Sequence, residues 1–258
     1  MWDAILPGLL GSLAAGAMTA VGAAPVRFGR RPSQRLNDAL LGFAAGVMLA
    51  ATFFSLLVPA IENAEGLYGA RPLAAAIAVG GTALGAGTVA LLNETLPHEH
   101  FLGGREGPEA EALRRIWLFV IAIAIRNAPE GLAVGVAFGG GNIANGVTLA
   151  VGIGLQNAPE GLAVAVALMS VGRAPRDAFA VAAATGPVEP VAGALGAAVV
   201  GLSAHVLPWG LAFAAGAMIY VISHEIIPET HRHGARRLAT LGLTAGLCLM
   251  MFLDVALG

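Results

Sequence analysis

The sequence predicts an all-α membrane protein whose eight transmembrane helices occupy the whole chain, residues 1–258, as a single transmembrane domain. The 258 residues are 57% hydrophobic and only 12% charged, and the mean hydropathy is +0.78. Apolar stretches of about 20 residues, the length that crosses a hydrocarbon core of about 30 Å, recur with short polar interruptions. The predicted spans are residues 4–26, 36–60, 73–96, 115–138, 143–170, 178–201, 206–229 and 236–257.

The first three spans are predicted from their apolar composition. Asp3 stands where the basic region of a signal peptide would lie, and arginines follow the first span, so we expect a retained helix. The third span ends in NETLPHEH, whose carboxylates and imidazoles are natural ligands of transition metals. A short HxH in a solvated loop is as often incidental, so both interpretations of His98 and His100 stay open.

The fourth and fifth spans carry a duplicated motif. Residues 126–137 read RNAPEGLAVGVA and residues 156–167 read QNAPEGLAVAVA, with ten of twelve positions identical. Consecutive transmembrane helices run in opposite directions, so the copies are expected to face each other around a pseudo-two-fold axis near the bilayer midplane. Asn127, Gln156 and Asn157 stand three or four positions before the glutamate of their copy, which places the polar groups of each copy on one helix face.

Three glutamates lie mid-span at one predicted depth: Glu130, Glu160 and, in the sixth span, Glu189. Ionisable groups are costly in hydrocarbon and usually mark a transport path or a proton relay. Because unpaired carboxylates would be protonated or would repel one another, a divalent cation is the simplest partner for all three. A role in helix kinking and packing explains the prolines and glycines of the motif, but not three glutamates.

Prolines and glycines shape the same segments. Each proline lacks a backbone N–H, so the carbonyl four residues earlier loses its helical donor and becomes a candidate oxygen ligand. These carbonyls belong to Ile125, Leu155 and Gly186. Gly131 and Gly161 remove side-chain bulk and are predicted to allow close helix approach.

The last two spans add polar residues at their ends. His224 and Glu225, in SHEIIPETHRH, fall in the last turns of the seventh span, where we favour a role in metal release over a satisfied interhelical pair. The eighth span ends near Asp254, which with Glu62 and Glu65 could attract cations at the opposite side of the membrane. Acidic residues at helix ends are, however, normally just solvated.

All fourteen basic residues are arginines, and twelve of them lie in the loops that follow odd-numbered spans. The positive-inside rule assigns those loops to the cytoplasm, so both termini are predicted to lie outside. The exceptions are Arg71, in an outer loop, and Arg126, inside the fourth span. The net charge of −2 gives no sign of a nucleic-acid partner; the expected partners are divalent metal ions and the lipid bilayer.

Together these motifs resemble the ZIP (Zrt/Irt-like) family of divalent metal transporters, particularly its bacterial members. The resemblance covers nearly the whole chain and includes both pentads, the VEP glutamate, HEIIPETHR, LGFAAGVMLA, LPHEH, IWLFV and MFLDVALG. It implies a bundle in a bacterial inner membrane in which inverted repeats, helices 1–3 and 6–8, enclose helices 4 and 5. It also implies zinc as the transported ion, with cadmium, iron and manganese as alternatives, and no cofactor.

Carried over by position, the family's two central metal sites fall on two sets of residues: Arg126, Glu130, Gln156 and Glu160, and Asn127, Asn157, Glu160 and Glu189. The family usually has histidine at the place of Arg126, and often aspartate at that of Asn157. A guanidinium has no lone pair, so Arg126 cannot bind a metal. We expect its charge to occupy the first site, rather than to point away, and to leave one central ion.

Alternating access is the expected mechanism: an ion enters from outside, binds centrally and leaves past His224 and Glu225 into the cytoplasm. The chain lacks GxxxxGK[ST], so an ion gradient or the membrane potential is expected to drive transport. An intramembrane metalloprotease is disfavoured, because HExxH would need histidine in place of Pro228. A metal sensor without flux and a substrate altered by Arg126 stay open, as does the oligomeric state, with a homodimer among the options. The hard oxygen donors tilt the expectation slightly from zinc toward manganese or iron.

Overall fold

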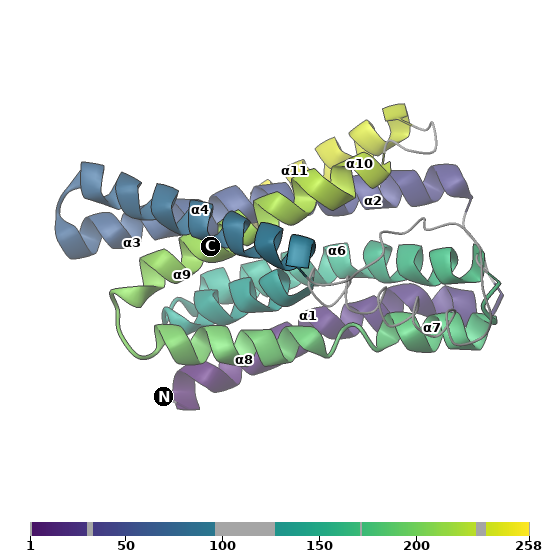
Figure 1. Ribbon diagram of the computed structural model, residues 1–258, viewed down its shortest axis with the longest axis horizontal. Coiled ribbons are helices and arrows are strands. Elements are labelled where there is room, and N and C mark those ends of the chain that lie inside the picture. Colours follow the sequence, from purple (N-terminus) through teal and green to yellow (C-terminus); the bar gives the residue numbers. More distant parts are fainter. Residues whose placement is uncertain (1, 30–32, 96–126, 171, 231–235, 258) are drawn as a thin grey trace.

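The structure is a computed structural model and describes residues 2–29, 33–95, 127–170, 172–230 and 236–257 (Figure 1). These residues form helices and connecting turns and include no strand. Within the described ranges, seven helical runs are long and apolar enough to cross a membrane. The predicted all-α class of membrane protein is therefore confirmed.

The first half of the chain forms three long helical runs. They are α1 (Trp2–Arg27); a continuous run of α2 (Gln34–Ala50), the π-helical turn η1 (Ala51–Leu57) and α3 (Val58–Tyr68); and α4 (Arg71–Thr95). The Ser33 hydroxyl caps α2 by accepting the Leu36 N–H at 3.3 Å. Pro59 explains the π-helical turn, because it cannot donate to the carbonyl of Ser55.

The second half begins, within the described residues, with a helix over residues 127–139. It continues with α6 (Ile143–Ser170), α7 (Pro175–Ala183), α8 (Val188–Val200), α9 (Val206–Val221), the π-helical turn η2 (Ile222–Ile226), α10 (Ile227–Thr230) and α11 (Arg236–Leu257). Two predictions need comment. Half of the fourth span, residues 115–126 of 115–138, lies outside the described residues. The sixth span, predicted as one helix over residues 178–201, is instead broken at residues 184–187 into α7 and α8.

The helices pack into two groups (Figure 1). The first helix group contains α1, the helix over residues 127–139, α6, α7 and α8, and the second contains α2, α3, α4, α9, α10 and α11. Within the first group α1 packs against α6 and α8, and within the second α2 packs against α11 and α4 against α9. Contacts between the groups are made chiefly by α6 against α2 and α11.

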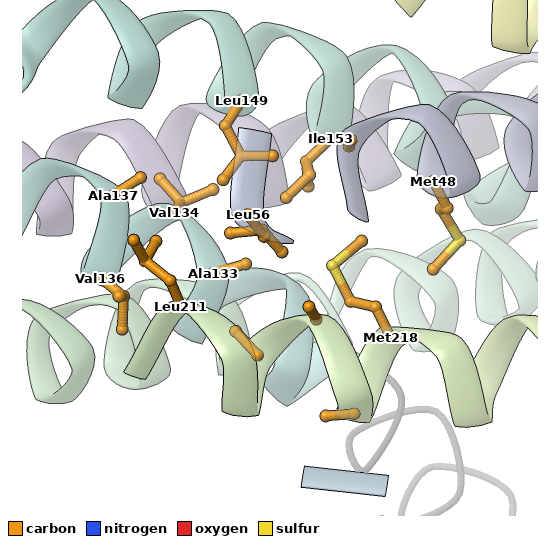
Figure 2. Packing of buried hydrophobic residues seen from close by; sticks show 14 of the residues in the cluster. Met48, Leu56, Ala133, Val134, Val136, Ala137, Leu149, Ile153, Leu211 and Met218 are labelled. Carbon is orange, nitrogen blue, oxygen red and sulfur yellow. The ribbon is translucent and has the colours of Figure 1, made fainter. Parts of the chain in front are cut away.

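The largest apolar core lies where the two groups meet (Figure 2). The first group contributes Ala133 and Ile153, and the second contributes Met48, Leu56 and Met218, all of them buried. Large apolar side chains also cover the outside of the bundle, a pattern that suits a surface facing lipid rather than water. The polar side chains of the duplicated motif are themselves buried within the bundle.

Candidate metal centre

Six of the predicted site residues lie inside the first helix group. Each side chain is between 0% and 3% exposed. They come from the helix over residues 127–139, from the middle of α6 and from the first turn of α8: Asn127, Glu130, Gln156, Asn157, Glu160 and Glu189. Polar groups of this kind stay buried only when partners offset the loss of water, so their contacts decide what the cluster can do.

Asn157 joins three helices through its side chain. Its amide nitrogen, Nδ2, donates to both carboxylate oxygens of Glu189, at 2.9 and 3.0 Å, and lies 3.0 Å from the carbonyl oxygen of Ala15 in α1. These contacts join α6, α8 and α1 in the core of the group. Because the nitrogen faces the acceptors, the amide oxygen of Asn157 remains as a lone-pair donor.

Asn127 is held in a different way. Its amide nitrogen donates to the carbonyl oxygen of Thr185 at 3.3 Å. Thr185 lies in the break between α7 and α8, and its own hydroxyl donates to the carbonyl of Ala182 at 2.8 Å. The carbonyl of Thr185 also accepts the N–H of Val188 in the turn, at 3.4 Å, so it is shared between the break and Asn127.

The break also determines the electrostatics at Glu189. Because α8 begins at Val188, Glu189 stands in its first turn, where the helix dipole and the unpaired N–H groups favour a negative charge. The carbonyl of Gly186, which we expected to lack a donor, instead accepts the N–H of Glu189 at 3.1 Å. That carbonyl is therefore not a free oxygen ligand, because the tight turn replaces the donor that Pro190 removes.

Close approach of the motif helices to their neighbours is confirmed. A Cβ added at Gly131 would overlap the backbone of Glu189, and one added at Gly161 would overlap the backbone of Thr19 in α1. Any larger residue would force the helices apart. Both glycines therefore place the polar face of their own helix directly against the neighbouring helix.

Gln156 is an exception to the rule that buried polar groups are satisfied. It is fully buried, and neither its amide nitrogen nor its oxygen has a hydrogen-bond partner in the described part of the chain. Such a group is uncommon in a well-packed protein and is explained when an ion or water completes the site. The described ranges hold no group of three or more His, Cys, Asp or Glu side chains that could bind a metal, so a metal here would need amide oxygens as well.

The predicted release residues lie away from this centre. His224, exposed in η2, stacks on Tyr220 with ring centroids 5.0 Å apart, and its Nε2 is 3.2 Å from the amide nitrogen of Asn93 in α4. That nitrogen also donates to the Tyr220 hydroxyl at 3.3 Å. Glu225 lies in η2 next to His224. Arg126, His98, His100, His231 and His233 fall outside the described residues.

A smaller polar cluster lies near the end of α11. The Ser55 hydroxyl in η1 donates to the carboxylate of Asp254, and the carbonyl of Ser55, freed by Pro59, accepts the amide N–H of Asn145 at 3.2 Å. Glu65 forms an exposed ion pair with Arg71 at 2.8 Å, a kind of pair that contributes little to stability.

Sequence reasoning missed the backbone partners of the two asparagines, at Ala15 and Thr185. Neither residue carries charge, and no residue type reveals an exposed carbonyl. The one available signal was position: Thr185 lies four residues before Glu189, one helical turn away on the same face. Tyr220 stands at the same distance before His224 and was overlooked for the same reason.

The family model described as ZIP Zinc transporter matches residues 90–254 of this chain. The zinc transporter GufA of Myxococcus xanthus is 44% identical, over 97% of this chain and 99% of its own length. The zinc transporter ZIPB of Bordetella bronchiseptica is 47% identical, over 97% of this chain and 81% of its own length. The human zinc transporter ZIP11 is 35% identical, over 99% of this chain and 98% of its own length.

Proposed function

This chain belongs to the ZIP zinc transporter family, and we propose that it carries zinc across a bacterial inner membrane through the buried polar cluster of the first helix group. The family consists of transporters rather than enzymes, and the chain is a multi-pass membrane protein. One observation carries the proposal. Asn157 bridges Glu189 and the backbone of Ala15 inside helices of membrane-spanning length, where such polar groups mark ion paths.

The ligands we propose for the ion are oxygens. Asn127 and Asn157 have their amide nitrogens held by backbone carbonyls, which leaves each amide oxygen as a lone-pair donor. The carboxylates of Glu160 and Glu189 supply the charge that a divalent cation requires. Gln156 and Glu130 belong to the neighbouring site of the resemblance, which Arg126 would occupy with its own charge, so we propose one central ion.

Transport is proposed to proceed by alternating access. The ion would pass Asp254 and Ser55 near one end, bind centrally, and leave past His224 and Glu225 at the other. The support for a moving unit is the division into two helix groups with denser packing within each group than between them. The support for inverted repeats is the matched pairing of α2 with α11 and of α4 with α9, as repeats of helices 1–3 and 6–8 require.

Metal flux in reconstituted vesicles tests this function. Zinc placed outside vesicles that contain the purified protein is expected to accumulate in the lumen, and a panel of cadmium, iron and manganese would show the selectivity. Empty vesicles supply the background rate. Binding of zinc to the purified protein without accumulation would instead favour a metal sensor, and absence of both would favour a substrate altered by Arg126.

The proposed direction rests on the arginines. The end of α1 and the starts of α2, α7 and α11, which carry most of the described arginines, lie at one end of the bundle (Figure 1). The positive-inside rule places that end in the cytoplasm. A cysteine introduced near Arg105, in a variant with Cys248→Ser, is expected to react only from the cytoplasmic side. Reaction with an impermeant reagent added to intact cells would reverse the orientation.

A further inference from the structure

The two motif helices meet their neighbours through matching contacts. Gly131 lies against the Cα, carbonyl carbon and carbonyl oxygen of Glu189, and Gly161 lies against the same three atoms of Thr19. Asn127 donates to the carbonyl of the residue four positions before Glu189, and Asn157 donates to the carbonyl of the residue four positions before Thr19. The glycine contact and the asparagine hydrogen bond therefore join the helix over residues 127–139 to α8 and its preceding turn, and join α6 to α1, in the same way.

A third contact fixes the axis that relates them. A Cβ on Gly16 would lie 2.6 Å from the carbonyl oxygen of Gly186, and a Cβ on Gly186 would overlap the carbonyl of Gly16, so these two glycines pack on each other. Gly16 lies three residues before Thr19, and Gly186 lies three residues before Glu189. Residues 15–19, AGAMT, therefore occupy the place that residues 185–189, TGPVE, occupy in the other half.

Thr19 lies on the face of α1 that lines the metal centre. Ala15 and Gly16 stand four and three residues before it, on the same helix face. The carbonyl of Ala15 contacts Asn157, and a Cβ on Gly16 would lie 3.3 Å from the carboxyl carbon of Glu189. Thr19 itself is 4% exposed, and its backbone contacts the glycine that follows Glu160.

Within the part of the chain that the structure describes, the hydroxyl of Thr19, like that of Thr148 in α6, lacks the hydrogen bond that several other threonines of these helices form. Thr52, Thr88, Thr240 and Thr244 each donate to the carbonyl four residues earlier, at 2.7 to 2.9 Å. For Thr19 that carbonyl belongs to Ala15, which already accepts the amide of Asn157. No hydrogen bond of the Thr19 hydroxyl is formed within the described ranges, so its oxygen is left for another partner.

We propose that the Thr19 hydroxyl is a further oxygen of the central metal site, standing opposite Glu189 across the pseudo-two-fold axis. The inference rests on the proposed transport function and adds a residue of α1 to its site. Threonine is shorter than glutamate, so its hydroxyl binds the ion directly or holds one of its water molecules. A neutral oxygen in place of another carboxylate limits the negative charge that the buried site must accommodate.

Zinc binding to the purified full-length protein, measured by calorimetry, tests this role. Thr19→Val keeps the shape and removes the hydroxyl, and it is expected to weaken binding about fivefold. Thr19→Ser is expected to bind like the wild type, as is the control Thr88→Val, whose hydroxyl is exposed and bonded within α4. Wild-type affinity in Thr19→Val, or equal loss in Thr19→Ser, would overturn the proposal. A wild type that binds no zinc would overturn the proposed function instead.

An exchange of the two side chains tests the pseudo-symmetry itself. Glu189→Thr is expected to lose measurable zinc binding, and adding Thr19→Glu is expected to restore binding in part, because the carboxylate returns on the opposite side of the same centre. A double variant that is monodisperse and helical but binds no zinc would show that the two positions are not equivalent. If the double variant does not fold, the comparison of Thr19→Val with Thr19→Ser still decides the proposal.

Discussion

The two copies of Asn-Ala-Pro-Glu-Gly have the same sequence but different surroundings. The copy in α6 contacts α1, and its Asn157 donates hydrogen bonds to the carboxylate of Glu189. The copy at the start of the helix over residues 127–139 contacts α8, and within the described residues the side chain of Asn127 bonds to backbone, at Thr185. The motif thus supplies two similar polar faces, whereas the flanking helices decide which asparagine meets the carboxylate of Glu189.

The difference teaches where the asymmetry of a duplicated site comes from. The backbones of Glu189 and Thr19 each pack against the glycine of one motif copy, yet one side chain is a carboxylate and the other a hydroxyl. The longer, charged carboxylate of Glu189 reaches Asn157 in the opposite copy, whereas threonine offers a shorter, neutral side chain. The chemistry of the centre is therefore unequal, although the backbone around it is nearly matched.

The largest expected effect comes from removing the carboxylate that breaks the symmetry. Glu189→Ala is expected to abolish zinc flux into vesicles, because no neighbouring side chain replaces its charge, and Glu160→Ala is expected to do the same. Circular dichroism and gel filtration should show that both variants remain folded. Normal flux in Glu189→Ala would exclude the central cluster as the transport site.

Asn157→Ala and Asn127→Ala test the comparison directly. Because Asn157 orients the carboxylate of Glu189, its loss is expected to weaken zinc binding about 10- to 100-fold. Loss of Asn127 removes one neutral hydrogen bond and one amide oxygen, so an effect nearer to about fivefold to tenfold is expected. Equal losses, measured by calorimetry on the two purified variants, would mean that the copies act alike despite their surroundings.

Arg126→His is expected to have the smallest effect on the ion already bound. The substitution restores a lone-pair donor and removes a permanent charge, so the number of central zinc ions per chain should rise from about one to about two. Anomalous scattering or calorimetry would count them. Two central ions in the wild type would show that the guanidinium does not occupy the first site.

Much of the fold could be predicted because hydropathy determines which segments cross a membrane. The limits of α1 and α11 agree with their predicted spans to within a few residues, since arginines mark the end of α1 and the start of α11. The break before Glu189 was not predicted, because Gly186 and Pro187 are as compatible with a kinked helix as with two short ones. Packing against Gly16 and the bond from Asn127 favour the broken form, and both involve distant parts of the chain.

The site was predicted as a set of residue types but not as a set of bonds. Burial of the three glutamates follows from their place in apolar segments, and it is confirmed. The pairing of Asn157 with Glu189 depends on the angle at which α6 and α8 meet, and the role of Ala15 depends on a backbone carbonyl. Residue types reveal neither a helix crossing angle nor an exposed backbone carbonyl. The contact of α1 with the site therefore could not be predicted from the motif.

The continuous run from α2 to α3 is longer than a bilayer requires. Its 35 residues, at about 1.5 Å per residue, measure roughly 52 Å, and the turn into α4 projects beyond the α8–α9 connection (Figure 1). That turn carries the exposed pair of Glu65 and Arg71 and lies far from the metal centre. It is therefore a suitable site for a grafted epitope. An antibody fragment bound to that epitope would be held rigidly for electron microscopy without contacting the ion path.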